Sequence, residues 1–132
     1  MQTTATFRLF GGEGLTAGAV TSRLGIQPSK SFEAGTPMNP RSPKLRDSSA
    51  WLLQSSSEIE VGVELEEQLG RLLTILEPHA DALWDLVRQG YRANWFCYVA
   101  SNPAEHAVEL NRELLGRLVH LPGDLWLDVC GD

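Results

Sequence analysis

Five leucines between residues 65 and 76 repeat at the spacing of one helical face. They are Leu65, Leu69, Leu72, Leu73 and Leu76. Apolar residues at i, i+4, i+7, i+8 and i+11 lie on one side of an α-helix and have to be buried against another element. Pro78 lacks an amide hydrogen, so it either kinks this helix or opens a second one as a first-turn residue. A second apolar stripe, with Leu83, Trp84 and Val87, ends at Gly90. We therefore expect a long helix or a helix pair that packs on a larger surface.

Segments rich in β-formers supply that surface. Residues 4–10 and 93–100 alternate between two faces, and residues 51–55 and 125–130 are also expected to be strands. In the strand at 93–100, Trp95, Cys97 and Val99 share one face, while Phe96 and Tyr98 share the other. Alternation of this kind is typical of a sheet that is covered on one side.

Two shorter helices are expected between these strands. Thr16 can cap the first, which Gly25 ends. The second has leucines on its inner face: Leu110, Leu114, Leu115 and Leu118. The order is then strand-helix-strand, a helix pair, and strand-helix-strand, so that each half can form a right-handed βαβ crossover. The sequence predicts one α+β domain over 1–132, a two-layer sandwich with a mixed sheet of four or five strands and helices packed on one face.

The charge balance argues against several classes of partner. The formal net charge is −6, and a strongly acidic surface repels phosphate backbones and anionic membranes. No apolar run approaches the roughly 18 residues that a membrane-spanning helix needs, and the first residues lack the pattern of a signal peptide. We therefore expect a cytoplasmic protein that binds neither nucleic acid nor membranes, with its two cysteines reduced.

A long segment at 27–50 has neither the helical nor the strand period. It contains three prolines after Ser29 and four cations, which are Lys30, Arg41, Lys44 and Arg46. Loops longer than about 12–15 residues are uncommon in compact domains unless they are functional or disordered. This loop is therefore the first candidate for a functional segment.

The loop is expected to border the sheet face that the helices leave open. Alternation places four aromatic side chains, an arginine and a carboxylate on that face, among them Phe10, Phe96, Tyr98 and Trp126. If the first and last strands are neighbours, Arg8 and Asp128 can pair across the sheet beside these rings. The candidate site consists of Arg8, Phe10, Arg41, Lys44, Arg46, Tyr98, Trp126 and Asp128. Such a site suits a planar or anionic group. The alternative is a structural ion pair beneath a loop that serves as a fixed lid.

The residues that carry catalysis or bind metals elsewhere form no recognisable motif here. His79, His106 and His120 lie in separate elements and lack the close spacing of zinc ligands. Cys97 and Cys130 fall in two strands, where inert thiols are the expected state. The glycines of GGEG follow a strand but lack the full phosphate-binding pattern. We expect no cofactor and no metal.

Several stretches resemble one bacterial family, domain of unknown function 4279. They are FRLFG near the start, LGIQPSKSFEAGTP from Leu24, SAWLLQS around Trp51, the helix LEEQLGRLLTILEPHADAL and the strand WFCYVAS. The resemblance covers nearly the whole chain and implies a shared architecture. It implies no reaction and no catalytic residues, because the family carries no established activity. By analogy with other small bacterial families, it suggests an immunity or accessory role.

Two classes of function remain open. The first is a non-catalytic binding or interaction module, which uses either the aromatic sheet face or the acidic helix segment at 58–88. The second is a small-molecule site, with or without catalysis, between the 27–50 loop and the open sheet face. The absence of a recognisable nucleophile–base pair favours the first class.

Overall fold

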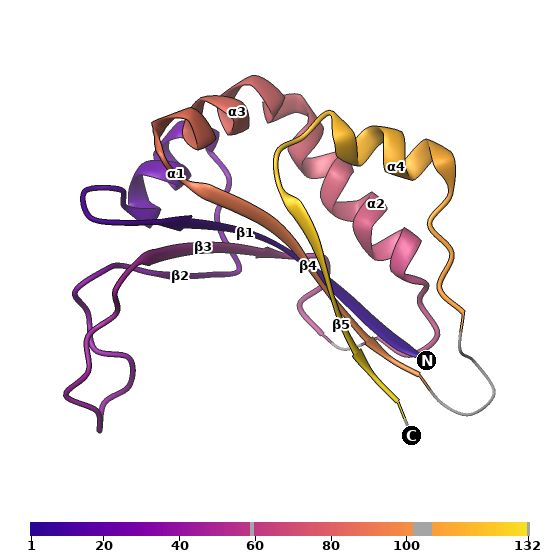
Figure 1. The fold of residues 1–132 in the computed structure, drawn as a ribbon, viewed down its shortest axis with the longest axis horizontal. Helices are drawn as coiled ribbons and strands as arrows, with labels where there is room; N and C mark the ends of the chain where they lie inside the picture. The colour runs from indigo at the N-terminus through magenta and orange to yellow at the C-terminus, as the bar shows by residue number, and fades with distance from the viewer. Residues whose placement is uncertain (59, 102–106, 132) are drawn as a thin grey trace.

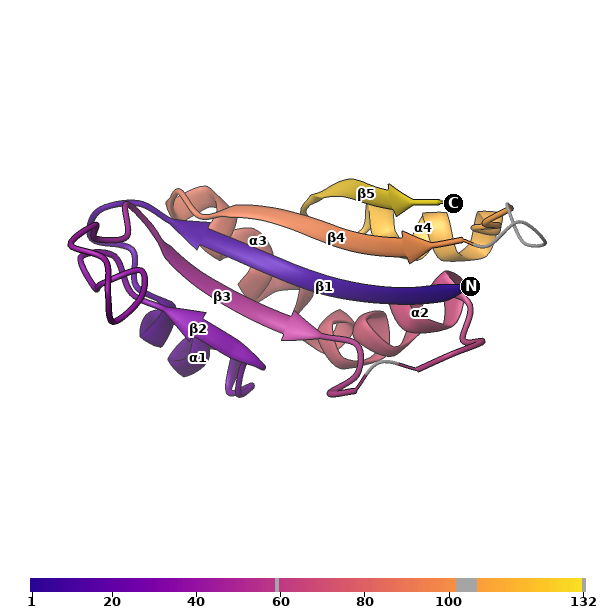
Figure 2. The ribbon, with the colours of Figure 1, turned by 90° about the horizontal axis from the view of Figure 1, so that it is seen from below.

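The computed structural model describes residues 1–58, 60–101 and 107–131. Its elements follow in the order β1 (Gln2–Gly11), α1 (Ala17–Leu24), β2 (Lys30–Phe32), β3 (Ser49–Gln54), α2 (Leu65–Leu76), the 3₁₀ turn η1 (Glu77–His79), α3 (Ala80–Gln89), β4 (Arg92–Ala100), α4 (Arg112–Val119) and β5 (Asp124–Cys130). The helices lie on one face of the sheet, and within the described ranges no helix covers the opposite face (Figures 1 and 2). The α+β class and the two-layer arrangement are therefore confirmed.

The sheet has five strands in the order β2-β3-β1-β4-β5. β1 lies in the middle and pairs antiparallel with both β3 and β4, while β5 pairs parallel with β4. The second half of the chain therefore forms a βαβ unit, as predicted. The prediction for the first half was wrong, because β1 and β3 are antiparallel and the helix between them joins neighbouring strands of opposite direction.

The structure also corrects the prediction of an irregular loop over 27–50. Residues Lys30–Phe32 form the edge strand β2, which pairs antiparallel with β3. Three residues are too few for an alternating pattern to be recognised in a sequence. The strand forms because β3 offers it a free row of backbone groups, which is a tertiary cause.

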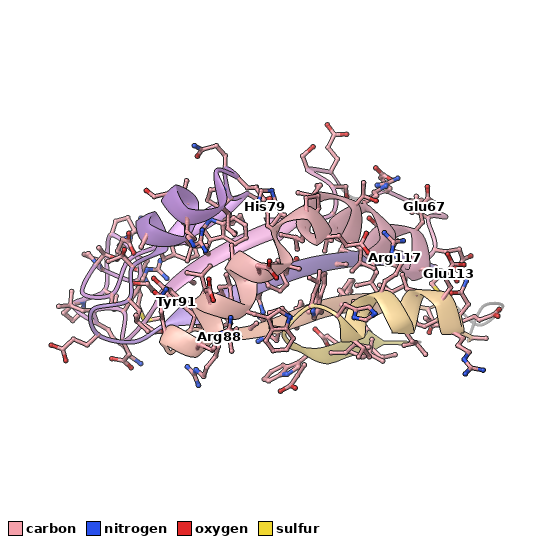
Figure 3. All side chains as sticks on the ribbon, turned by 90° about the horizontal axis from the view of Figure 1, so that it is seen from above. Glu67, His79, Arg88, Tyr91, Glu113 and Arg117 are labelled. Atoms are coloured by element: carbon pink, nitrogen blue, oxygen red, sulfur yellow. The ribbon has the colours of Figure 1, made fainter. Side chains whose placement is uncertain are left out.

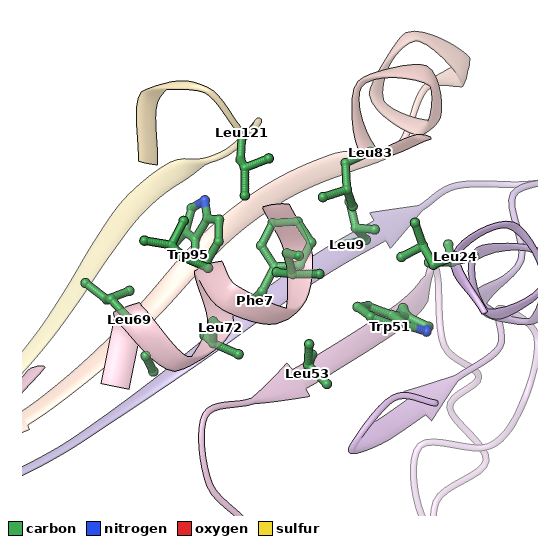
Figure 4. Packing of buried hydrophobic residues seen from close by; sticks show 14 of the residues in the cluster. Phe7, Leu9, Leu24, Trp51, Leu53, Leu69, Leu72, Leu83, Trp95 and Leu121 are labelled. Carbon is green, nitrogen blue, oxygen red and sulfur yellow. The ribbon is translucent and has the colours of Figure 1, made fainter. Parts of the chain in front are cut away.

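The core lies between the sheet and the helices (Figure 4). The rings of Phe7 and Trp95 meet with centroids 4.7 Å apart, and the five leucines of α2 are at most 1% exposed. The indole N–H of Trp95 donates to the carbonyl of Pro122 at 3.1 Å, so that this large ring is buried without an unpaired donor. The helical stripe of α2 therefore covers the centre of the sheet as the sequence predicted.

One polar side chain fastens α2 to the central strand. Gln68 is fully buried, and its amide N–H donates to the carbonyl of Thr3 at 2.9 Å. Its carbonyl accepts from the Ser55 hydroxyl at 2.7 Å. A buried amide is tolerated when both of its ends are paired, so Gln68 fixes the position of the helix along the sheet.

The helix layer ends before it covers β5, contrary to expectation. Leu125, Leu127 and Val129 lie on the helix side of the sheet, in register with Trp95, Cys97 and Val99, yet they are 38%, 53% and 64% exposed. Leu115, predicted on the inner face of α4, is 44% exposed, whereas Leu114 is buried.

Among the described residues, no helix is both long and apolar enough to cross a membrane.

The leucine stripe of α2 gives a direct test of this packing. We expect Leu72→Ala to lower the free energy of unfolding by about 2–5 kcal/mol, because the fully buried side chain leaves a cavity. The matched control is Ile75→Ala on the same helix, where the side chain is 43% exposed and the loss should be well below that of Leu72→Ala. Equal losses in chemical denaturation would show that the helix presents another face to the sheet.

Candidate functional site

Arg8 lies on the open face of the sheet, near the C-terminal end of the middle strand β1. It is in register with Leu52 of β3 on one side and with Asn94 of β4 on the other, and Asp124 of β5 continues the row. The Arg8 Nε donates a hydrogen bond to Oδ1 of Asn94 at 2.6 Å. Because β1 is hydrogen-bonded on both sides, this guanidinium is held by the most constrained strand of the sheet.

Aromatic rings surround the Arg8 guanidinium. Its central carbon lies 4.4 Å from the ring centroid of Phe96, 5.3 Å from that of Phe10 and 5.6 Å from that of Trp126. Contacts within about 6 Å are stabilising cation–π interactions. Desolvation by burial lowers the pKa of Arg8, but an arginine remains charged at neutral pH. The site therefore holds a partly desolvated positive charge on an aromatic floor.

That charge has no carboxylate partner in the described part of the chain. The ion pairs there involve Arg23, Arg71, Arg88 and Arg117, all on the helix side of the molecule, and none involves Arg8. Apart from Nε, the guanidinium makes no hydrogen bond within the same residues. Its terminal nitrogens are thus free to donate to a bound group.

The loop beyond β2 forms a wall beside this arginine. The N–H of Arg46 donates to the carbonyl of Thr36 at 2.8 Å, and the N–H of Met38 donates to that of Lys44 at 3.1 Å. The segment therefore folds back on itself as a narrow hairpin, which projects from one end of the sheet on the side away from the helices (Figure 1). The Arg46 guanidinium carbon lies 3.8 Å from the ring centroid of Phe32, so the base of the hairpin is tied to β2.

Glu33 anchors the hairpin to the first helix. Its carboxylate oxygens accept from the backbone N–H groups of Ala17 at 2.7 Å and Gly18 at 3.1 Å, at the start of α1. Desolvation acts to raise the pKa of Glu33, but these two bonds and one from Ser49 outweigh it and lower the pKa. A carboxylate at a helix N-terminus is stabilised by the unpaired N–H groups there. The position of the loop is thus set at its first residue.

Two grooves meet at Arg8. One, of about 370 Å³, lies between the sheet and the hairpin and is lined by Arg8, Phe10, Phe32, Met38, Lys44, Leu45, Arg46, Asp47, Ser48, Ala50 and Leu52. The other, of about 530 Å³, runs toward β5 and is lined by Arg8, Phe10, Ser48, Arg92, Ala93, Asn94, Asp124 and Trp126. Arg8, Phe10 and Ser48 belong to both. We call the two grooves together the open-face site.

The structure brings five of the eight predicted site residues together. Arg8, Phe10, Lys44 and Arg46 line the first groove, and Trp126 lines the second. Arg41 lies nearer the tip of the hairpin, where its N–H donates to Oδ1 of Asn39 at 2.9 Å, and it lines neither groove.

The predicted pairing of Arg8 with Asp128 was wrong. β4 lies between β1 and β5, so the two strands are not neighbours. Asp128 is in register with Tyr98, whereas Arg8 is in register with Asn94, four residues earlier on β4. Four residues of a strand span roughly 13 Å, which places Tyr98 and Asp128 outside both grooves. The open-face site is therefore smaller than predicted and is centred on one end of the sheet.

Several residues of the open-face site were not predicted from the sequence, among them Asn94 and Phe32. Asn94 has the parity of the open face and could have been assigned to it from the alternation of β4 alone. Phe32 could not, because it reaches the site through the short strand β2, for which the sequence has no periodic signal.

In the described part of the chain, histidines and cysteines line neither groove. In the described residues, no three His, Cys, Asp or Glu side chains are grouped so that they could hold a metal ion, and His106 lies outside those residues. Cys97 is fully buried under the helices, where burial raises the pKa of its thiol to about 12. Cys130 is in register with Ala100, so the two cysteines are not opposite each other, and both are free thiols.

The sequence profile of one family matches residues 1–131. Its description is "Domain of unknown function (DUF4279)". The chain belongs to the DUF4279 family. It matches no curated protein and no solved structure. Membership in DUF4279 therefore supports the shared architecture, and the chemistry of the open-face site has to be argued from its own residues.

The contrast between the two thiols is testable. At pH 8 we expect an aromatic disulfide reagent to modify Cys130 within minutes and to leave Cys97 unmodified in the folded protein, because only a thiolate that the reagent can reach reacts. In denaturant both thiols should react. Cys130→Ser is the matched control and should abolish the fast reaction. Rapid modification of Cys97 in the folded variant would contradict the closed packing of β4.

Proposed function

We propose that this DUF4279 protein is a non-catalytic binding module that holds an acidic side chain of a protein partner at Arg8. The observation that carries the proposal is the partly buried Arg8 guanidinium, which has three aromatic contacts, one amide acceptor and no carboxylate partner among the described residues. An arginine that is already positioned and desolvated loses little further entropy or hydration when it binds a carboxylate.

The surroundings favour a single carboxylate over a polyanion. Lys44 and Arg46 add positive charge at the hairpin, but Asp47 and Asp124 line the same two grooves. A chain of phosphates would meet these carboxylates and the net charge of −6. One acidic side chain can reach Arg8 between them, while apolar neighbours of that side chain contact Phe10, Phe32 and Leu45.

The acidic helix segment is a weaker candidate for the docking surface. Figure 3 shows the helix layer from above. Several carboxylates of the segment at 58–88 already form ion pairs with arginines. Hydrogen bonds from Arg117 lower the pKa of Glu77, and those from Arg88 and Arg23 lower that of Asp85. Arg71 pairs with both Glu60 and Glu67. A basic partner would have to displace these arginines first.

A small planar carboxylate is the second candidate ligand. The groove of about 370 Å³ between sheet and hairpin falls within the range of small-molecule sites, which is roughly 300–1,000 Å³. Its floor is apolar and Arg8 lies at its edge, so that an aromatic acid can place its ring on the floor and its carboxylate on the guanidinium. An immunity or accessory role for either kind of binding stays a prediction.

The test uses short fluorescent peptides that differ at one residue, a glutamate in one series and a glutamine in the other, each flanked by leucine and phenylalanine. Fluorescence anisotropy should show that the wild-type protein prefers the glutamate peptides. Arg8→Met should weaken that binding by roughly 10-fold to 100-fold, because a hydrogen-bonded charge pair is lost.

The matched control is Tyr98→Phe, on the same sheet face but outside both grooves. It should leave the affinity unchanged, and thermal melts of both variants should confirm that they fold. Equal binding of the glutamate and glutamine peptides, or unchanged binding by Arg8→Met, would overturn the proposal.

A further inference from the structure

The edge strand β5 is exposed along its whole length. All of its residues, Asp124–Cys130, are solvent-exposed, and among the described residues it pairs with β4 alone. The carbonyl of Cys130 accepts from the N–H of Ser101 at 2.9 Å. Backbone groups alternate along a strand, so those of Asp124, Trp126 and Asp128 also point toward β4. The N–H and C=O groups of Leu125, Leu127 and Val129 therefore point to the free edge.

Apolar side chains are exposed on β5 and on α4, the helix that precedes it in the chain. On the helix side of the sheet, Leu125, Leu127 and Val129 are 38–64% exposed. On α4, Leu115 and Val119 are 44% and 75% exposed, and they lie on the side of the helix turned away from the contact of Arg117 with Glu77. We call these five residues the β5 strip. Its three β5 residues lie in register with the buried core residues Trp95, Cys97 and Val99 of β4.

The strand has few of the features that protect an edge, and its charged residues are the two aspartates Asp124 and Asp128. Natural edge strands are kept from pairing by lysines, prolines, bulges or short length. The opposite edge strand, β2, has three residues, whereas β5 has seven and contains neither lysine nor proline. An edge that is long, apolar and unprotected is expected to be covered in the working protein.

We propose that β5 pairs antiparallel with β5 of a second copy of this chain, around a two-fold axis at Leu127. The two strands then form one ten-stranded sheet, and the β5 strips of both copies meet on the helix side. The pairing is self-complementary, because the outward backbone groups of Leu127 bond to those of Leu127 in the second copy. Leu125 of each copy bonds in the same way to Val129 of the other.

Strand overlap and charge together select this register, because an axis at Leu125 or Val129 would pair only three residues of each strand. With the axis at Leu127, all seven residues overlap, Asp128 faces Trp126 of the second copy, and Asp124 faces Cys130. With the axis at Trp126, Asp124 would face Asp128. With the axis at Asp128, that carboxylate would face Asp128 of the second copy. Like charges directly opposite each other destabilise a sheet, so the register centred on Leu127 is preferred.

The exposed area is near the lower limit for a dimer. The β5 strip exposes several hundred Å² of apolar surface on each copy, so two copies bury at most on the order of 1,000 Å². The backbone hydrogen bonds at the new strand pair add to this. The proposal does not rest on the function proposed for Arg8, although Asp124 and Trp126 of β5 also line the second groove of the open-face site.

The oligomeric state in solution tests the proposal. Sedimentation equilibrium of the full chain at tens of micromolar should show a dimer. Leu127→Lys places two ammonium groups opposite each other at the axis and should raise the dissociation constant at least 100-fold. Ile75→Lys, a charge placed at a 43% exposed position on α2, is the matched control and should not change it. A wild-type monomer, or a dimer that Leu127→Lys does not affect, would overturn the proposal.

A cross-link identifies the register even if the lysine variant fails to fold. Cys97 is in register with Leu127, so the test uses a Cys97→Ala, Cys130→Ser background in which no native thiol lies beside position 127. There Leu127→Cys brings two thiols together at the axis, where the Cα atoms of a hydrogen-bonded pair lie about 5.5 Å apart, within the range for a disulfide. Mild oxidation should convert most of the protein to a covalent dimer. Leu45→Cys on the hairpin is the control and should remain monomeric on a denaturing gel. No cross-link at position 127, or equal cross-linking at position 45, would contradict the pairing.

Discussion

The hydrogen bonding of β1 on both of its sides is the constraint from which the rest of the structure follows. β1 pairs with β3 along one edge and with β4 along the other, so neither its register nor its two faces can shift. A slip by one residue would expose Phe7 and Leu9 and bury Arg8, at a cost far above the stability of a small domain. The alternation of one strand therefore decides both where the helices pack and which charge the open face presents.

The same constraint explains why Arg8 suits recognition. Its neighbours on β1 are fully or almost fully buried, so the backbone beneath the guanidinium is rigid. Asn94 and the three rings then orient the side chain, while the hairpin at residues 33–48 supplies a wall whose position Glu33 fixes at the N-terminus of α1. A binding group that is positioned before the partner arrives loses less entropy on binding, which is how a shallow surface can still be selective.

Much of the architecture could be predicted from the sequence, because the periodic signals were long. The apolar stripe of α2 and the alternation of β4 each extend over enough residues to define a face, and the structure confirms both. It also confirms Thr16 as the N-cap of α1. Strand order could not be predicted, since nothing in the alternation of β1 and β5 tells which strand lies between them. For that reason Arg8 and Asp128 were paired wrongly, while Arg8, Phe10 and Trp126 were correctly placed on one face. Phe32 and the exposure of β5 depend on tertiary pairing and on the extent of the helix layer, neither of which has a local signal.

The most direct test of the account is an NMR titration of the arginine side chains with acetate, a carboxylate without further contacts. The Nε–H signal of Arg8 should be distinct, because it donates to Asn94 and is partly desolvated. As acetate is added, the Arg8 Nε–H signal and the indole N–H signal of Trp126 should shift and then reach a plateau. The indole N–H signal of Trp84, on the helix side, should stay unchanged. A shift of Arg8 that is no larger than those of the exposed arginines, and that does not saturate, would contradict the claim that the open face holds a prepared anion-binding arginine.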